Sequence, residues 1–146
     1  MLVNFFNPPV KLKFKKFHKS STFNLLTQNL FISSSYHEVS FLKSLTHGRL
    51  SINHLEAARK VIRRKMKKSG TLRAYAYPYV CTTKKALAVR MGKGKGAIDR
   101  WVFPVRPGRV LFEIYNASVA LSSEALLMAS KKLPIRSKVI VFRKKN

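Results

Sequence analysis

The chain has 146 residues, and its 30 Lys and Arg against 5 Asp and Glu give a net charge of +25 at pH 7. This length suits one domain, and a hydrophobic content of 46% is enough for a core. So much positive charge repels itself in a compact fold, which disfavours a merely solvated basic surface. We therefore expect a polyanionic partner, first nucleic acid and second an acidic membrane surface.

Several classes of site are excluded by the composition. The single cysteine, Cys81, allows neither an internal disulfide nor a cysteine-based zinc site. The four histidines are scattered, so we predict no metal and no cofactor. No apolar run reaches the roughly 18 residues of a membrane-spanning helix, so we predict no membrane insertion.

The N-terminal region reads as a basic arm. Residues 11–19, "KLKFKKFHK", place apolar side chains between five lysines. This pattern predicts a short strand or an extended segment, either an edge strand with a charged outer face or an arm along RNA. We divide the chain into this arm, residues 1–20, and one domain, residues 21–146. Residues 20–40 are rich in Ser, Thr and Asn, which predicts a loop with a short strand near residues 30–32.

Residues 47–70 are predicted to form a helix. Ser51 can cap its start, with Asn53 and Glu56 as an alternative capping box, and residues 69–70 end it. A buried stripe is expected from Leu55, Ala58, Ile62 and Met66.

The polar side of this helix carries two basic ladders, Arg59, Arg63 and Lys67, and Lys60, Arg64 and Lys68. Like charges at such spacing each destabilise a helix by roughly 0.2–0.5 kcal/mol. A solvated face would normally include more glutamates, so the unmixed ladders favour a bound polyanion over a merely exposed face.

Alternating apolar residues predict the remaining elements. Strands are expected over residues 71–80 (ending at Pro78), 86–91, 100–105, 109–115 and 137–145, with the turn 106–109 pairing the third and fourth. A second helix is expected over residues 118–134, with Leu121, Ala125, Met128 and Ala129 facing the sheet. Much of the core should come from Trp101, Val102, Phe103, Val105, Val110, Leu111, Phe112 and Ile114. The fold class is therefore α+β: a single compact domain with an antiparallel or mixed sheet, two helices and a basic N-terminal arm.

The segment "MGKGKG", residues 91–96, invites comparison with nucleotide-binding loops. A P-loop needs a Ser or Thr after its lysine, but glycine follows both Lys93 and Lys95. The dinucleotide pattern fails because Ala97 and Asp99 stand where its last glycine would be. The five carboxylates form no close pair, so we predict no enzyme. Glycines and lysines in alternation favour a loop that becomes ordered against phosphates.

The chain resembles the large-subunit ribosomal protein sixteen family in its bacterial and organellar form. The resemblance rests on residues in family order and spacing: "KFKKFHK" (13–19), "GRL" (48–50), "LEAAR" (55–59), "LAVRMGKGKG" (87–96), "WV" (101–102), "PGRVLFEI" (107–114) and "KLPIR" (132–136). It implies a non-enzymatic α+β protein that binds large-subunit ribosomal RNA (rRNA), contacts neighbouring ribosomal proteins and helps organise the aminoacyl-tRNA site.

The resemblance also implies site residues. The expected rRNA contacts are Lys13, Lys15, Lys16, His18, Lys19, Arg49, Arg59, Arg63, Arg64, Lys67, Lys68, Arg106 and Arg109. The loop expected to point toward the tRNA site comprises Arg90, Met91, Gly92, Lys93, Gly94, Lys95 and Gly96. Arg90 falls on the arginine that some bacteria hydroxylate. Proline is usual in the family where Cys81 and Ala86 stand here.

The compartment is a further expectation. Few residues precede the arm, which leaves little room for a cleaved presequence, and abundant Phe, Lys, Asn and Ser are typical of A+T-rich genomes. These features favour a mitochondrion-encoded protein of the mitochondrial ribosome, with a plastid or the bacterial cytoplasm as alternatives. A non-ribosomal basic nucleic-acid-binding protein is the alternative function.

Overall fold

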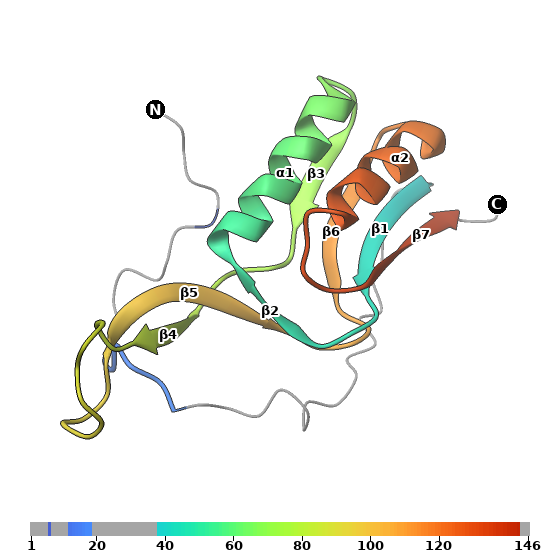
Figure 1. The fold of residues 1–146 in the computed structure, drawn as a ribbon. Coiled ribbons are helices and arrows are strands. Elements are labelled where there is room, and N and C mark those ends of the chain that lie inside the picture. The colour runs from blue at the N-terminus through green and yellow to red at the C-terminus, as the bar shows by residue number, and fades with distance from the viewer. Residues whose placement is uncertain (1–5, 7–11, 19–37, 144–146) are drawn as a thin grey trace.

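Two antiparallel sheets and two helices make up the computed structural model, which describes Phe6, residues 12–18 and residues 38–143 (Figure 1). In chain order the elements are β1 (Glu38–Ser44), β2 (Gly48–Ser51), α1 (Ile52–Met66), β3 (Thr71–Ala74), β4 (Val80–Lys84), β5 (Ala97–Val105), β6 (Val110–Tyr115), α2 (Val119–Ser130) and β7 (Ser137–Arg143). Sheet A has the strand order β3-β6-β1-β7, and sheet B has the order β2-β5-β4. The predicted single α+β domain is confirmed, but its strands form two sheets rather than one.

The helices cover one face of sheet A, as Figure 1 shows. The predicted stripe of α1 is confirmed, because Leu55, Ala58, Ile62 and Met66 are all buried in the main core cluster. In α2 the prediction was partly wrong. Met128 is exposed and Leu126 is buried instead. A buried hydrogen bond of 2.7 Å between the hydroxyls of Ser122 and Ser40 holds α2 in this rotation on β1.

Sheet B extends away from this core. The inner half of β5 is buried and joins the core cluster through Phe103 and Val105, beside Leu50 of β2. The outer half, residues 97–100, is exposed. Trp101 lies at the boundary and is only half-buried, which corrects its prediction as a core residue. Strands β4 and β5 therefore form a projecting hairpin, with residues 85–96 as the loop at its far end (Figure 1).

Two strand predictions were wrong. The strand expected over residues 71–80, ending at Pro78, is shorter, because β3 of sheet A ends at Ala74 and the next strand, β4, begins at Val80 and belongs to sheet B. The turn at residues 106–109 pairs no strands with each other, because β5 belongs to sheet B and β6 to sheet A. This turn is held instead by β1, since the Ser44 hydroxyl donates to the carbonyls of Arg106 at 2.5 Å and Arg109 at 3.1 Å.

Other helix and strand boundaries also differ from the predicted ones. Strand β1 begins inside the predicted loop over residues 20–40, and β2 occupies the start of the predicted helix. Ser51 is the N-cap as predicted, and it forms the capping box with His54, so the alternative box of Asn53 and Glu56 is wrong. The strand expected over residues 86–91 is absent from the described structure, and those residues belong to the loop. The strand expected near residues 30–32 lies outside the described residues.

Candidate nucleic-acid interface

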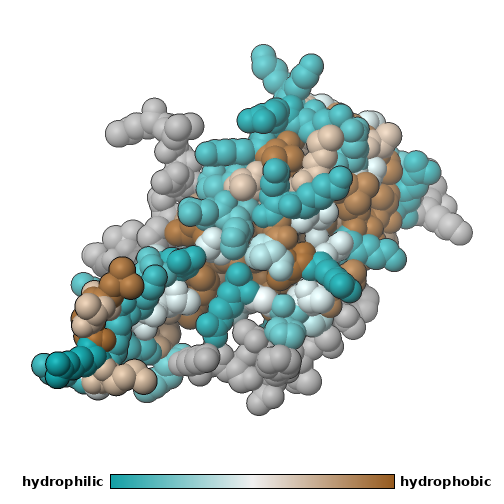
Figure 2. Space-filling model, viewed as in Figure 1, coloured by the Kyte–Doolittle hydropathy of each residue, from teal (hydrophilic) through white to brown (hydrophobic). Residues whose placement is uncertain are grey.

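The loop of residues 85–96 presents apolar side chains to solvent. Leu87 is 93% exposed and Met91 is 98% exposed, and Val89 is half-exposed. This exposure explains the failed strand prediction, because these side chains have no sheet or core to pack against. Figure 2 shows hydrophobic and hydrophilic residues side by side at this projecting end of the molecule. Such exposed apolar groups beside cations are typical of a surface that a partner covers.

Two lysines hold the loop through backbone carbonyls. The Lys85 ammonium donates to the Gly92 carbonyl across the loop, and the Lys95 ammonium donates to the Phe17 carbonyl of the arm. Gly96 closes the base of the loop, because a Cβ there would lie 2.6 Å from the Lys84 carbonyl oxygen. These contacts join the two sides of the loop to each other and its base to the arm.

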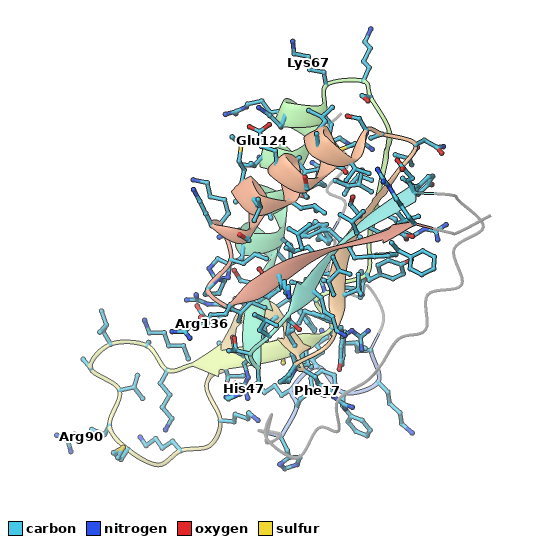
Figure 3. All side chains as sticks on the ribbon, turned by 90° about the vertical axis from the view of Figure 1, so that its right-hand side faces the viewer. Phe17, His47, Lys67, Arg90, Glu124 and Arg136 are labelled. Atoms are coloured by element: carbon cyan, nitrogen blue, oxygen red, sulfur yellow. The ribbon has the colours of Figure 1, made fainter. Side chains whose placement is uncertain are left out.

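The remaining loop cations point outward. Among the residues that the structure describes, neither Arg90 nor Lys93 has a hydrogen-bonding or ion-pair partner. Figure 3 shows the Arg90 side chain at the far end of the loop, away from the body of the domain. These two cations are available to an anionic ligand, whereas Lys95 is already engaged with the arm.

The described part of the arm lies against sheet B and the loop. The Cys81 thiol donates to the Lys15 carbonyl at 2.9 Å, and the Lys16 ammonium donates to the Lys95 carbonyl at 3.0 Å. Residues 12–18 form no strand, so the edge-strand interpretation is wrong for them, and the backbone bends at residues 13, 15 and 16. The side chains of Lys13, Lys15, Lys16 and His18 are exposed, and Lys19 lies outside the described residues.

Helix α1 presents a second basic surface. Arg63, Arg64, Lys67 and Lys68 are exposed, with the last two just beyond the end of the helix at Met66. Lys60 belongs to the same exposed surface, although it is absent from the expected contacts. Arg59 differs from them, because it is half-buried and its guanidinium lies 3.0 Å from the Glu56 carboxylate.

The other three predicted arginines differ in their surroundings. Arg49 is exposed on β2 and lines a hollow beside the arm. Arg106 and Arg109 are half-buried at the junction of the two sheets. The Arg109 guanidinium lies 5.0 Å from the centre of the Phe103 ring, a cation–π contact that gives this residue a role in packing.

All five carboxylates of the chain lie within ion-pair distance of a Lys or Arg. Four pairs are close, at 2.7–3.0 Å, and the fifth joins Glu113 to Arg73 at 3.9 Å. Most of the basic side chains in the described part of the chain thus lie outside these five pairs. Within the described ranges, no three His, Cys, Asp or Glu side chains gather where they could hold a metal ion. No helix in the described part of the chain has the length and apolar character needed to cross a membrane.

The fold brings some of the predicted site residues close together and places others far apart. The arm, Arg49 and the loop meet at one end of the molecule, whereas Lys67 lies at the opposite end (Figure 3). The α1 cations and the loop therefore address different parts of any partner.

Sequence reasoning missed three residues of these surfaces. Lys85 directly precedes the loop motif and was not singled out. Leu87 and Val89 were assigned to a strand, because apolar alternation does not distinguish a half-buried strand from a loop that a partner covers.

Comparisons with known proteins agree with this geometry. The profile of the family described as ribosomal protein L16p/L10e matches residues 11–140. Similar curated proteins include the large ribosomal subunit protein uL16 of Psychrobacter arcticus, which is 38% identical over 132 residues, covering 90% of this chain and 94% of its own. The uL16 of Pelagibacter ubique is 41% identical over 133 residues, covering 90% and 95%. That of Alkalilimnicola ehrlichii is 39% identical over 129 residues, covering 88% and 92%.

These matches span the described arm, both sheets and both helices. A family profile over most of the chain, together with relatives near 40% identity across nearly their whole length, establishes common descent and a common fold. The chain therefore belongs to the ribosomal protein L16p/L10e family.

Proposed function

We propose that this chain binds rRNA through its arm and the exposed α1 cations, and reaches toward the aminoacyl-tRNA site with residues 85–96. Family membership makes it a structural, non-enzymatic constituent of the large ribosomal subunit that binds rRNA and ribosomal proteins. The specific contacts and the tRNA are the proposal. The projecting loop carries it, because Arg90 and Lys93 lie beside exposed Leu87 and Met91 at a point far from the core.

The cations divide into two groups by role. The first group contacts rRNA phosphates and positions the domain. It comprises the exposed cations of α1 together with Lys13, Lys15, Lys16, Lys19 and Arg49. Phosphate contacts carry no sequence information, so these residues set affinity and its salt dependence. We propose contacts with the same RNA for His18, Arg59, Arg106 and Arg109. Two of these, Arg59 and Arg109, also have partners within the chain.

The second group consists of the cations of the loop, residues 85–96. Glycine at positions 92 and 94, where a Cβ would meet open space, lets the backbone approach a phosphate, and Arg90 and Lys93 supply charge. Lys95 also orients the loop, because its ammonium donates to the Phe17 carbonyl of the arm. Met91 and Leu87 supply apolar contact to unstacked bases.

Sedimentation tests the ribosomal assignment against a non-ribosomal nucleic-acid-binding protein. The chain should sediment with large-subunit particles from a lysate at moderate salt, and ribonuclease should release it. Recovery mainly away from these particles would favour the alternative.

Paired substitutions test the loop. Arg90→Ala with Lys93→Ala should leave incorporation into the subunit unchanged and slow aminoacyl-tRNA accommodation, because neither side chain has a partner in the described structure. Lys131→Ala with Lys132→Ala removes the same charge from exposed positions after α2 and serves as the control. Equal accommodation rates for the two variants would refute the role of the loop.

We also propose the mitochondrial ribosome as the site of action, because the composition is typical of an A+T-rich genome. The relatives described above are bacterial, so the plastid and the bacterial cytoplasm remain the alternatives. Probing ribosomes from purified mitochondria, plastids or bacterial cells of the source organism distinguishes the three.

A further inference from the structure

A hollow of about 250 Å³ lies where the arm meets sheet B. Its polar and aromatic lining comes from the arm, β2, β4 and the loop: Phe17, His18, Arg49, Thr82, Thr83 and Lys95. Pockets for free small molecules are usually larger, about 300–1,000 Å³. This size suits one planar ring better than a whole nucleotide cofactor.

The walls of the hollow are held by bonds between segments far apart in sequence. The Cys81 thiol bonds to the Lys15 carbonyl, and Lys16 and Lys95 each donate to a carbonyl on the other side. The Thr82 hydroxyl donates to the Arg100 carbonyl at 3.1 Å, which ties it to β5. The hollow is therefore formed before any ligand arrives, which lowers the entropy cost of binding.

The lining combines three kinds of group that recognise an unstacked base. The Phe17 ring offers a surface for stacking, and threonine hydroxyls can hydrogen-bond a base edge. Arg49 and Lys95 can bind the attached phosphate, and the Lys95 ammonium has three donors, of which one reaches Phe17. No carboxylate lies among the described lining residues, so a cationic ligand would meet only positive charge.

We propose that this hollow receives one unstacked nucleotide of the large-subunit rRNA. The base lies on Phe17 with its edge at Thr82 and Thr83, and its phosphate lies between Arg49 and Lys95. This inference rests on the proposed function, since the nucleotide belongs to the RNA that the arm contacts. The arm thereby makes a specific contact with one nucleotide, in addition to its electrostatic contacts with phosphates.

Substitution of Phe17 tests the stacking contact. The full chain is bound to large-subunit particles that lack it, and affinity is measured over a series of salt concentrations. Phe17→Ala should weaken binding by about tenfold, as loss of one base–aromatic stack does. The slope of log affinity against log salt should not change, because no phosphate contact is lost. Phe17→Trp should restore affinity.

Phe14→Ala is the matched control, because Phe14 lies in the same arm, is 71% exposed and does not line the hollow. It should bind like the unmodified chain. Equal affinities of Phe17→Ala and Phe14→Ala would overturn the inference.

Ultraviolet cross-linking in the same particles identifies the ligand. One nucleotide should be attached to Phe17 in some molecules and to residues 80–83 in others. If the chain enters the particle and cross-links to RNA elsewhere but at neither of these places, the nucleotide site is refuted and the proposed function stands. A neighbouring protein found at Phe17 would also refute the site. If the chain does not enter the particle, both proposals fall.

Discussion

At the scale of single residues, Tyr75, which follows β3, makes a partly buried contact with Glu113 of β6. The Tyr75 hydroxyl donates to the Glu113 carboxylate at 2.5 Å, and the Glu113 side chain is only 3% exposed. Arg73 lies 3.9 Å from the same carboxylate but is largely exposed. Tyr75 is therefore the closer partner of a buried negative charge in a strongly basic protein.

Tyr75→Phe should destabilise the fold by about 1–3 kcal/mol, because a buried carboxylate loses its hydroxyl donor. Urea unfolding measures this loss. Tyr77→Phe is the control, since Tyr77 is nearby and 45% exposed, and it should have little effect. Equal stability of the two variants would contradict the role given to Tyr75.

The same pair predicts a pH dependence. Burial, reinforced by the hydrogen bond to Glu113, raises the pKa of Tyr75 above its ordinary value of 10.0. The folded chain then holds this proton more tightly than the unfolded chain. The contribution to stability is present below pH 10 and is lost as the pH rises through the raised pKa. Above pH 10 the free energy of unfolding should therefore fall less steeply in Tyr75→Phe than in the unmodified chain.

At the scale of elements, the end of α1 carries backbone strain. Lys67 caps the helix with φ +53° and ψ −112°, backbone angles that residues other than glycine rarely adopt. Its amide still donates to the Arg63 carbonyl at 2.9 Å, so the helix end is hydrogen-bonded. The nearest glycine, Gly70, stands three residues later in the sequence. A glycine at position 67 itself would adopt these backbone angles with less strain.

Lys67→Gly should raise the free energy of unfolding by about 1 kcal/mol, because glycine relieves a strain of this order. Lys68→Gly is the matched control, since it removes the same charge at a residue without positive φ. It should leave stability unchanged or lower it. Thermal unfolding compares the two, and a Lys67→Gly variant no more stable than Lys68→Gly would show that position 67 is unstrained.

The elements also show where sequence reasoning succeeds. The stripe of α1 and the basic ladders could be predicted, because 3.6-residue periodicity and charge are local properties. The separation of β5 from β6 could not, because a strand pattern says which residues are apolar but not which strand they pair with. Leu87 and Val89 failed for a related reason: apolar alternation does not say whether a residue packs inside the chain or stays exposed, as these two do.

At the scale of the molecule, an excess of unpaired cations should set the salt dependence of rRNA binding. Removing a cation that contacts phosphate lowers the slope of log affinity against log salt by about 0.7–0.9. Arg64→Gln should do so, because Arg64 is exposed on α1. Arg59→Gln should change the slope less, because Arg59 is paired with Glu56. Equal slopes for the two variants would contradict the division of cations by role.

The central claim is that the loop reaches the aminoacyl-tRNA site, and cleavage from a tethered iron chelate tests it most directly. Met91→Cys places the chelate at a side chain position that is 98% exposed, whereas the chain's one cysteine, Cys81, is buried. In assembled ribosomes the chelate at residue 91 should cleave tRNA in the aminoacyl site. From Lys68→Cys, at the opposite end of the domain, it should cleave rRNA alone. Absence of tRNA cleavage from residue 91, or equal cleavage from both positions, would contradict the account.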